Sequence, residues 1–141
     1  MPSGELPVVY WDASAIVSVL FKDRSSARAF KWAARDGIHL LSSLAYAETC
    51  AVISRLKRER ILADVLIQAA LETLHQGPWR RLNSSPDWKL VALLADKWSL
   101  RGADLWHLAT AKSLQSEFPE LVLLTYDARL RAAAEGERLS D

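Results

Sequence analysis

Apolar positions along the chain follow two patterns, short uninterrupted runs and longer stretches with helical spacing. The short runs are rich in β-branched, aromatic and leucine residues and predict buried strands at residues 6–11, 38–41 and 121–124, with a weaker candidate at 79–82. The longer stretches predict helices at residues 15–21, 25–35, 43–60, 63–75, 87–99, 103–115 and 127–134. We expect the residues from 136 onward to form a tail.

Polar residues and prolines indicate where several of these helices begin. Ser14 is a candidate N-cap for the first helix, and Ser42 or Ser43 for the long third helix. Pro86 suits the first position of the helix at 87–99.

The order of these elements predicts the class of fold. Short apolar strands that alternate with longer helices indicate a parallel sheet covered on both faces. Uninterrupted apolar runs, rather than alternating ones, are typical of strands buried on both sides. Because the chain has no internal repeat or low-complexity stretch, we expect one α/β domain over residues 1–141. Its predicted architecture is three-layer α/β/α with a central, mainly parallel sheet.

Composition narrows the class of protein only moderately. The 18 basic and 17 acidic residues give a net charge of +1, which excludes neither a nucleic-acid partner nor an acidic one. The one cysteine, Cys50, cannot form an internal disulfide. Residues 1–5 lack a signal-peptide pattern, and no apolar run approaches the ~20 residues that span a bilayer. We therefore expect a soluble cytoplasmic protein with no membrane partner.

Two aspartates occupy matching positions in the predicted fold. Asp12 and Asp127 each follow a predicted strand and precede a helix. In an open parallel sheet, ligands bind at the edge formed by the carboxyl ends of the strands. Either residue alone is also a good helix cap. The occurrence of two on the same edge favours a functional site.

Two further acids lie on predicted helices among apolar neighbours. Glu48 has apolar residues at i−4, i−3, i+3 and i+4, so it projects from the helix face expected to meet the core. A buried carboxylate needs a cation or a shared proton, and the alternative to a site is a pair with an arginine or lysine. Asp104 lies at the start of an apolar stripe through Leu108 and Ala111, which favours a site residue. The alternative is that its negative charge stabilises the N-terminus of its helix.

These four acids, taken together, indicate a metal site. Four carboxylates at one edge would raise one another's pKa values unless a cation were bound. Oxygen ligands select hard cations such as Mg²⁺ or Mn²⁺. Such a cation can activate water and neutralise charge on phosphate oxygens, which suits phosphodiester hydrolysis.

Four segments of the sequence resemble a known family. They are YWDASA at 10–15, the helix around Glu48, LRGADLWHLATA at 100–111 and LTYDARL at 124–130. In this order they resemble the four acidic motifs of PIN domains, and the third closely resembles that of VapC-type toxins. The resemblance spans nearly the whole chain.

This resemblance implies a fold, an activity and partners. It implies a PIN-like domain with Mg²⁺- or Mn²⁺-dependent endoribonuclease activity, a VapB-type antitoxin that inhibits it, and a homodimer. The metal-binding and catalytic carboxylates it implies are Asp12, Glu48, Asp104 and Asp127. Ser14 and Thr125 would supply hydroxyl groups beside them.

Three other kinds of protein are alternatives to this interpretation. A haloacid-dehalogenase-like phosphatase needs a second aspartate two positions after the first, where this chain has Ser14. A phospho-acceptor receiver domain needs paired acids after the first strand and a late lysine, which are not evident. A catalytically silent PIN-like scaffold that binds protein or RNA remains the main alternative, although retention of all four acids argues against it.

Several further residues have both a functional and a structural interpretation. Arg101 precedes the Asp104 helix and is a candidate for contacting RNA phosphates. His107, one turn after Asp104, is more consistent with a packed or hydrogen-bonded histidine than with a metal ligand. A basic cluster on the long helix is either a solvated face or an RNA contact. Its members are Arg55, Lys57, Arg58 and Arg60.

Six tryptophans are many for this length. Trp32, Trp88 and Trp98 lie on helices whose other faces already supply enough apolar residues to pack on the sheet. Because aromatic residues are enriched at interfaces, we expect one or more of them at a dimer contact or an antitoxin groove. The alternative is that all six pack internally in a monomer.

Overall fold

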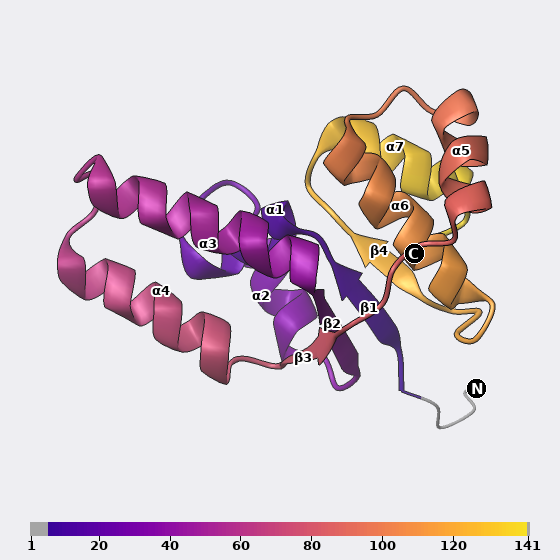
Figure 1. Cartoon of the computed structure of the whole chain (residues 1–141). Coiled ribbons are helices and arrows are strands. Elements are labelled where there is room, and N and C mark those ends of the chain that lie inside the picture. The colour runs from indigo at the N-terminus through magenta and orange to yellow at the C-terminus, as the bar shows by residue number, and fades with distance from the viewer. Residues whose placement is uncertain (1–5, 141) are drawn as a thin grey trace.

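The computed structural model describes residues 6–140, so the N-terminal segment in which no signal peptide is expected lies outside the described residues (Figure 1). The strands are β1 (Val8–Trp11), β2 (Ile38–Ser42), β3 (Trp79–Leu82) and β4 (Val122–Leu124). They form one sheet in the order β3-β2-β1-β4. Every pairing is parallel, which confirms the predicted sheet and places β1 in its centre.

The helices cover both faces of this sheet. They are α1 (Ala13–Leu20), α2 (Ser26–Ala34), α3 (Ser43–Arg58), α4 (Asp64–Gln76), α5 (Trp88–Lys97), α6 (Gly102–Gln115) and α7 (Ala128–Gly136). Figure 1 shows α1–α4 on one side of the sheet and α5–α7 on the other, which is the expected three-layer α/β/α arrangement. No helix within residues 6–140 combines the length and apolar character that a membrane crossing requires.

Alternate residues of the central strand supply the two cores. Val8 and Tyr10 of β1 belong to the core beneath α5, α6 and α7. Val9 and Trp11 belong to the core beneath α1, α3 and α4. Successive side chains of a strand point to opposite faces. A strand that is apolar at every position is therefore covered on both sides, as the sequence indicates.

Some predicted helix starts need correction. The N-cap of α1 is Asp12, whose Oδ1 accepts a hydrogen bond from the Ala15 amide at 2.9 Å, and Ser14 lies inside the helix. Ser42 caps α3 through the Ala45 amide at 3.1 Å, as one of the two expected alternatives. Asp87 caps α5, so Pro86 precedes the cap instead of opening the helix.

The predicted tail after residue 136 is packed against the sheet. Arg138 adopts a left-handed conformation with φ of 61°, and the Leu139 amide donates to the Ala134 carbonyl at 2.8 Å. This turn brings Leu139 into the core, where it is fully buried. The Leu139 carbonyl then accepts a hydrogen bond from the Leu123 amide of β4 at 2.6 Å. The last residues therefore extend the sheet's hydrogen bonding beyond β4.

Candidate active site

Asp12 lies at the centre of the carboxyl edge of the sheet, directly after β1. Its side chain is 3% exposed, and each of its oxygens accepts hydrogen bonds. Oδ1 accepts from the Ser14 hydroxyl at 2.7 Å, and Oδ2 accepts from the Thr125 hydroxyl at 2.6 Å. Burial raises the pKa of Asp12, while the hydrogen bonds from Thr125, the Ala15 amide and Ser14 favour the carboxylate.

A small hydrogen-bond network joins this aspartate to the end of β4. The Thr125 hydroxyl accepts from the Asp127 amide at 3.1 Å, and the Ser14 hydroxyl accepts from the Tyr126 amide at 3.0 Å. Asp127 Oδ1 in turn accepts from the Leu130 amide at 2.9 Å and caps α7. The two strand-end aspartates are therefore helix caps as well as neighbours at one edge, because capping uses only part of a carboxylate's acceptor capacity.

Glu48 projects from α3 toward α6, where a histidine binds it. His107 Nε2 lies 2.6 Å from Glu48 Oε1, and His107 Nδ1 lies 2.6 Å from the Tyr10 hydroxyl. His107 and Tyr10 are buried, whereas the Glu48 side chain is 32% exposed. The expectation that Glu48 is a buried carboxylate on the core-facing stripe is therefore wrong, because α3 turns its Ala45–Thr49–Ile53 stripe to the core and leaves Glu48 at its border.

The partners of His107 constrain the protons on its ring. A carboxylate can only accept, so Nε2 donates to Glu48 when that acid is ionised. Burial, together with the charges of Asp12 and Glu48, raises the pKa of Tyr10, which therefore keeps its proton and can donate it to Nδ1. This confirms that His107 is a packed, hydrogen-bonded histidine. Periodicity gave no sign of Tyr10, which looked like an ordinary core residue.

Asp104 lies in the first turn of α6 and is only partly buried. Burial contributes most to the rise in its pKa, followed by the negative charge of Asp127 and, more weakly, that of Glu48. His107 and Arg101 act in the opposite direction. Within residues 6–140, its carboxylate accepts no hydrogen bond, and the N-cap residue Arg101 has no side-chain cap. Asp104 is therefore not a helix cap, and its position leaves it available to a ligand.

The four carboxylates share one electrostatic environment without forming a closed cage. Over the described part of the chain, no three His, Cys, Asp or Glu side chains already surround a common point as metal ligands. The chemistry of the donors still suits a hard cation: all four are carboxylates. Among residues 6–140, Asp12 Oδ2 accepts one hydrogen bond and Asp104 accepts none from the protein.

The tryptophans considered for an interface and the basic cluster on α3 differ in their exposure. Of the three tryptophans considered for an interface, Trp88 is 88% exposed. Trp32 and Trp98 are partly buried against the two cores, and the Trp98 indole donates to Glu137 at 2.9 Å. The basic cluster on α3 is exposed, with Arg55 paired to Glu59 at 3.6 Å. It lies at the end of α3 away from Glu48.

Comparisons with known proteins show which family the chain belongs to. The family model of the PIN domain matches residues 9–136. Ribonuclease VapC3 of Mycobacterium tuberculosis is 36% identical over 135 residues, covering 94% of this chain and 91% of that protein. Ribonuclease VapC49 of M. tuberculosis strain H37Rv is 33% identical over 135 residues, covering 92% of this chain and 90% of that protein.

Two solved structures show the same fold. The crystal structure of M. tuberculosis VapC20, described as a sarcin-ricin loop cleaving toxin, superposes with a TM-score of 0.59 at 16% identity, covering 89% of this chain and 94% of that one. The structure of PAE2754 from Pyrobaculum aerophilum gives a TM-score of 0.59 at 19% identity, covering 89% and 83%. The chain therefore belongs to the PIN-domain family, as a VapC-type member.

Proposed function

We propose that this protein is a metal-dependent endoribonuclease that hydrolyses RNA phosphodiester bonds. The observation that carries the proposal is the carboxylate of Asp104, which is partly buried, has no partner within residues 6–140, and has a pKa raised by burial and by the charges of Asp127 and Glu48. An acid held in such a setting is destabilised unless a cation is bound beside it. The curated relatives VapC3 and VapC49 are named ribonucleases, which supports RNA as the substrate.

The proposed ligands of Mg²⁺ or Mn²⁺ are the carboxylates of Asp12, Glu48, Asp104 and Asp127. When bound, the cation would supply an activated water and would neutralise charge on the phosphate oxygens. The protein's own residues hold these ligands in place. Ser14 and Thr125 donate to opposite oxygens of Asp12. His107 holds Glu48, and the exposed Arg101 at the start of α6 would bind a substrate phosphate.

We also propose that a VapB-type antitoxin inhibits this activity, because the relatives are VapC proteins and one fold neighbour is described as a toxin. An inhibitor that places an arginine or lysine among the four acids would replace the cation's charge with its own. The product of an adjacent small open reading frame is the partner to test. We expect its co-purification with this protein and loss of cleavage in the complex; an adjacent product that binds without reducing cleavage would contradict this proposal.

The central test measures RNA cleavage in Mg²⁺, in Mn²⁺ and in EDTA. We expect cleavage by the wild-type protein only with a divalent metal, and none by Asp104→Asn. The matched control is Asp96→Asn, which removes an exposed carboxylate from α5. Undiminished cleavage in EDTA would contradict the metal mechanism. Binding of RNA without cleavage in either metal would favour the silent scaffold instead.

A further inference from the structure

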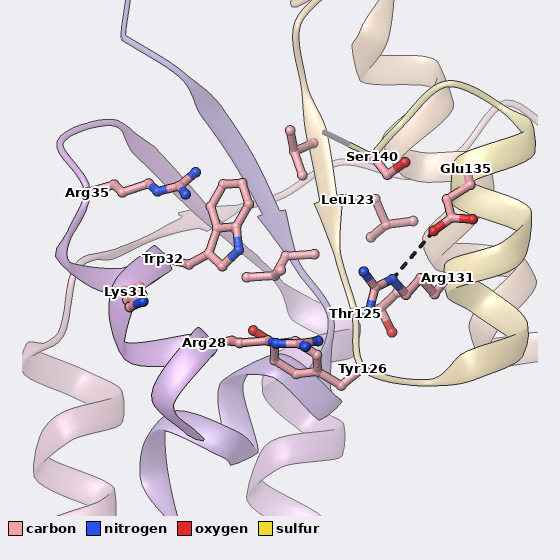
Figure 2. A pocket seen from close by; sticks show the side chains of 12 residues that line it. Arg28, Lys31, Trp32, Arg35, Leu123, Thr125, Tyr126, Arg131, Glu135 and Ser140 are labelled. Carbon is pink, nitrogen blue, oxygen red and sulfur yellow. Dashed lines mark ion pairs between the residues drawn. The ribbon is translucent and has the colours of Figure 1, made fainter. Parts of the chain in front are cut away.

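A basic groove lies beside the candidate active site, between α2 and α7 and along β4 (Figure 2). We call it the α2–α7 groove. Its α2 wall carries Arg28, Lys31, Trp32 and Arg35, its α7 wall carries Arg131 and Glu135, and residues 122–126 form its floor. None of these walls belongs to the four-acid site.

Charge in this groove is strongly one-sided. Its single acid, Glu135, pairs with Arg131 at 3.5 Å. Arg28, Lys31 and Arg35 are exposed, and among residues 6–140 none of them forms an ion pair. Three cations without acidic partners on one wall leave a positive potential that attracts a polyanion.

The α2 cations are arranged in a row. Arg28 and Lys31 lie one turn apart on α2, and Arg35 is the C-cap residue directly after the helix. At 1.5 Å per residue this row is about 10 Å long. The Arg35 guanidinium stacks on the Trp32 ring, 3.9 Å from its centroid, which holds that cation in a defined plane. Figure 2 shows Arg28 reaching toward Tyr126 on the floor.

Tyr126 lies on the groove floor between the two walls. Arg28 of α2 and Arg131 of α7 line the same groove on either side of it. The Tyr126 hydroxyl is buried and has no hydrogen-bond partner among the described residues. A buried donor without an acceptor costs free energy, which an anionic oxygen placed in the groove would recover.

The groove leads to the carboxylates. Thr125 lies on the groove floor and donates its hydroxyl proton to Asp12 at 2.6 Å. Tyr126 follows, and its amide donates to Ser14. A strand of nucleic acid lying in the groove would therefore continue directly onto the proposed cleavage edge.

The backbone of β4 argues against a peptide that adds to the sheet here. Such a peptide needs unpaired amide and carbonyl groups on the strand edge. The Leu123 amide is already bonded to the Leu139 carbonyl, so the chain's own last residues occupy this edge. What the groove still offers is cationic side chains, which recognise phosphates without reading sequence.

We propose that the α2–α7 groove binds the phosphate backbone of the substrate RNA on one side of the bond to be cut, with Arg28, Lys31 and Arg35 as the phosphate contacts. The identity of the ligand as RNA rests on the proposed function. The groove would supply affinity and register, while the four acids would perform the chemistry.

The test compares RNA binding by two double variants that each remove two positive charges. Arg28→Gln/Lys31→Gln changes the groove, and Lys57→Gln/Arg58→Gln changes the exposed end of α3. The probe is a fluorescein-labelled oligouridylate in EDTA, followed by fluorescence anisotropy between about 50 and 200 mM salt. Thermal unfolding of each variant verifies the fold, and Lys31→Gln alone provides a milder change.

We expect the groove variant to bind RNA more weakly. The slope of log affinity against log salt should become shallower by about 1.4, because each phosphate contact on a single strand contributes about 0.7 to that slope. Lys31→Gln should lose about 0.7, and the α3 variant should match the wild type. Oligocytidylate should give the same result. Wild-type binding by the groove variant, or equal losses in both double variants, would overturn the proposal. Loss of binding to a labelled polyglutamate peptide with RNA binding unchanged would assign the groove to an acidic protein instead.

The same data separate this proposal from the proposed function. Groove-dependent RNA binding without cleavage in Mg²⁺ or Mn²⁺ would reject the nuclease and keep the groove. Cleavage by the wild type together with unchanged RNA binding by the groove variant would reject the groove alone.

Discussion

His107 is hydrogen-bonded to Glu48 across the boundary between the core and the candidate site, with 2.6 Å between Nε2 and Oε1. The other ring nitrogen is hydrogen-bonded to the hydroxyl of Tyr10 in the central strand. A buried tyrosine thus fixes the orientation of the imidazole, and the imidazole fixes the orientation of a proposed ligand. Groups that orient metal ligands in this way affect metal affinity and activity.

Replacing His107 should therefore lower the rate of RNA cleavage, although His107 itself would not contact the RNA. We expect His107→Leu to lower the cleavage rate by about 10- to 100-fold and to shift the Mg²⁺ requirement to higher concentration. His107→Gln, whose amide can donate near the position of Nε2, should restore part of the rate. Initial rates over a Mg²⁺ titration measure both effects. A His107→Leu protein with the wild-type Mg²⁺ dependence would show that the histidine serves packing alone.

Removing the charge of Asp104 should stabilise the metal-free protein. Asn at this position keeps the shape and removes the charge that burial and Asp127 oppose. We expect a higher Tm in EDTA for Asp104→Asn than for the wild type at pH 7, and no change for Asp96→Asn. Addition of Mg²⁺ should raise the Tm of the wild type and not that of Asp104→Asn, since ligands stabilise the state that binds them. A lower Tm in EDTA would favour a structural role for Asp104.

The pH dependence of this effect has a defined sign. The pKa of Asp104 is raised in the folded protein, so the folded state favours the protonated acid. The stabilisation that protonated Asp104 gives the folded protein is complete below the ordinary aspartate pKa of about 3.9. It is lost as the pH rises through the raised pKa of Asp104 in the folded state. The Tm advantage of Asp104→Asn should thus vanish near pH 3 and grow above pH 4. Paired thermal scans across this range measure the difference between the two proteins.

Trp88 offers a test of self-association. It is 88% exposed on α5, beside Pro86, Val91 and Trp106, which form an apolar surface. Large exposed aromatics of this kind are typical of interfaces. We expect a homodimer in solution and a monomer for Trp88→Ser, measured by light scattering at micromolar concentration. Val65→Ser on α4, which is also strongly exposed, should leave the dimer intact. A monomeric wild-type protein would contradict the proposed dimer.

Two substitutions at the end of α7 should change the free energy of unfolding in opposite directions. A Cβ on Gly136 would lie 2.3 Å from the Trp98 ring, so Gly136→Ala should destabilise the protein by about 1–3 kcal/mol. Arg138 has φ of 61°, where glycine is less strained, so Arg138→Gly should stabilise by up to about 1 kcal/mol. Urea unfolding measures both changes. Equal stability of Gly136→Ala and the wild type would show that Trp98 moves aside freely.

Sequence patterns were sufficient for features that depend on neighbouring residues. The apolar runs predict the strands, and the aspartates that follow two of them lie at one edge because parallel strands end together. Hydrogen bonds link Tyr10 to His107 and His107 to Glu48. The first pair lies 97 positions apart and the second 59 positions apart, so hydrophobic periodicity cannot detect either contact. The burial of Trp98 is likewise set by α7, a distant element, and not by the pattern of its own helix.

The central place of β1 has a consequence for the timing of synthesis. The strand that carries Asp12 is translated well before its neighbour β4, which presents Thr125 and Asp127. Until residues 122–127 have been translated, Asp12 lacks the Thr125 hydroxyl that binds it and the edge lacks its fourth carboxylate. In a nascent chain, metal binding and cleavage by the four acids would therefore have to wait until β4 and the residues that follow it have been made.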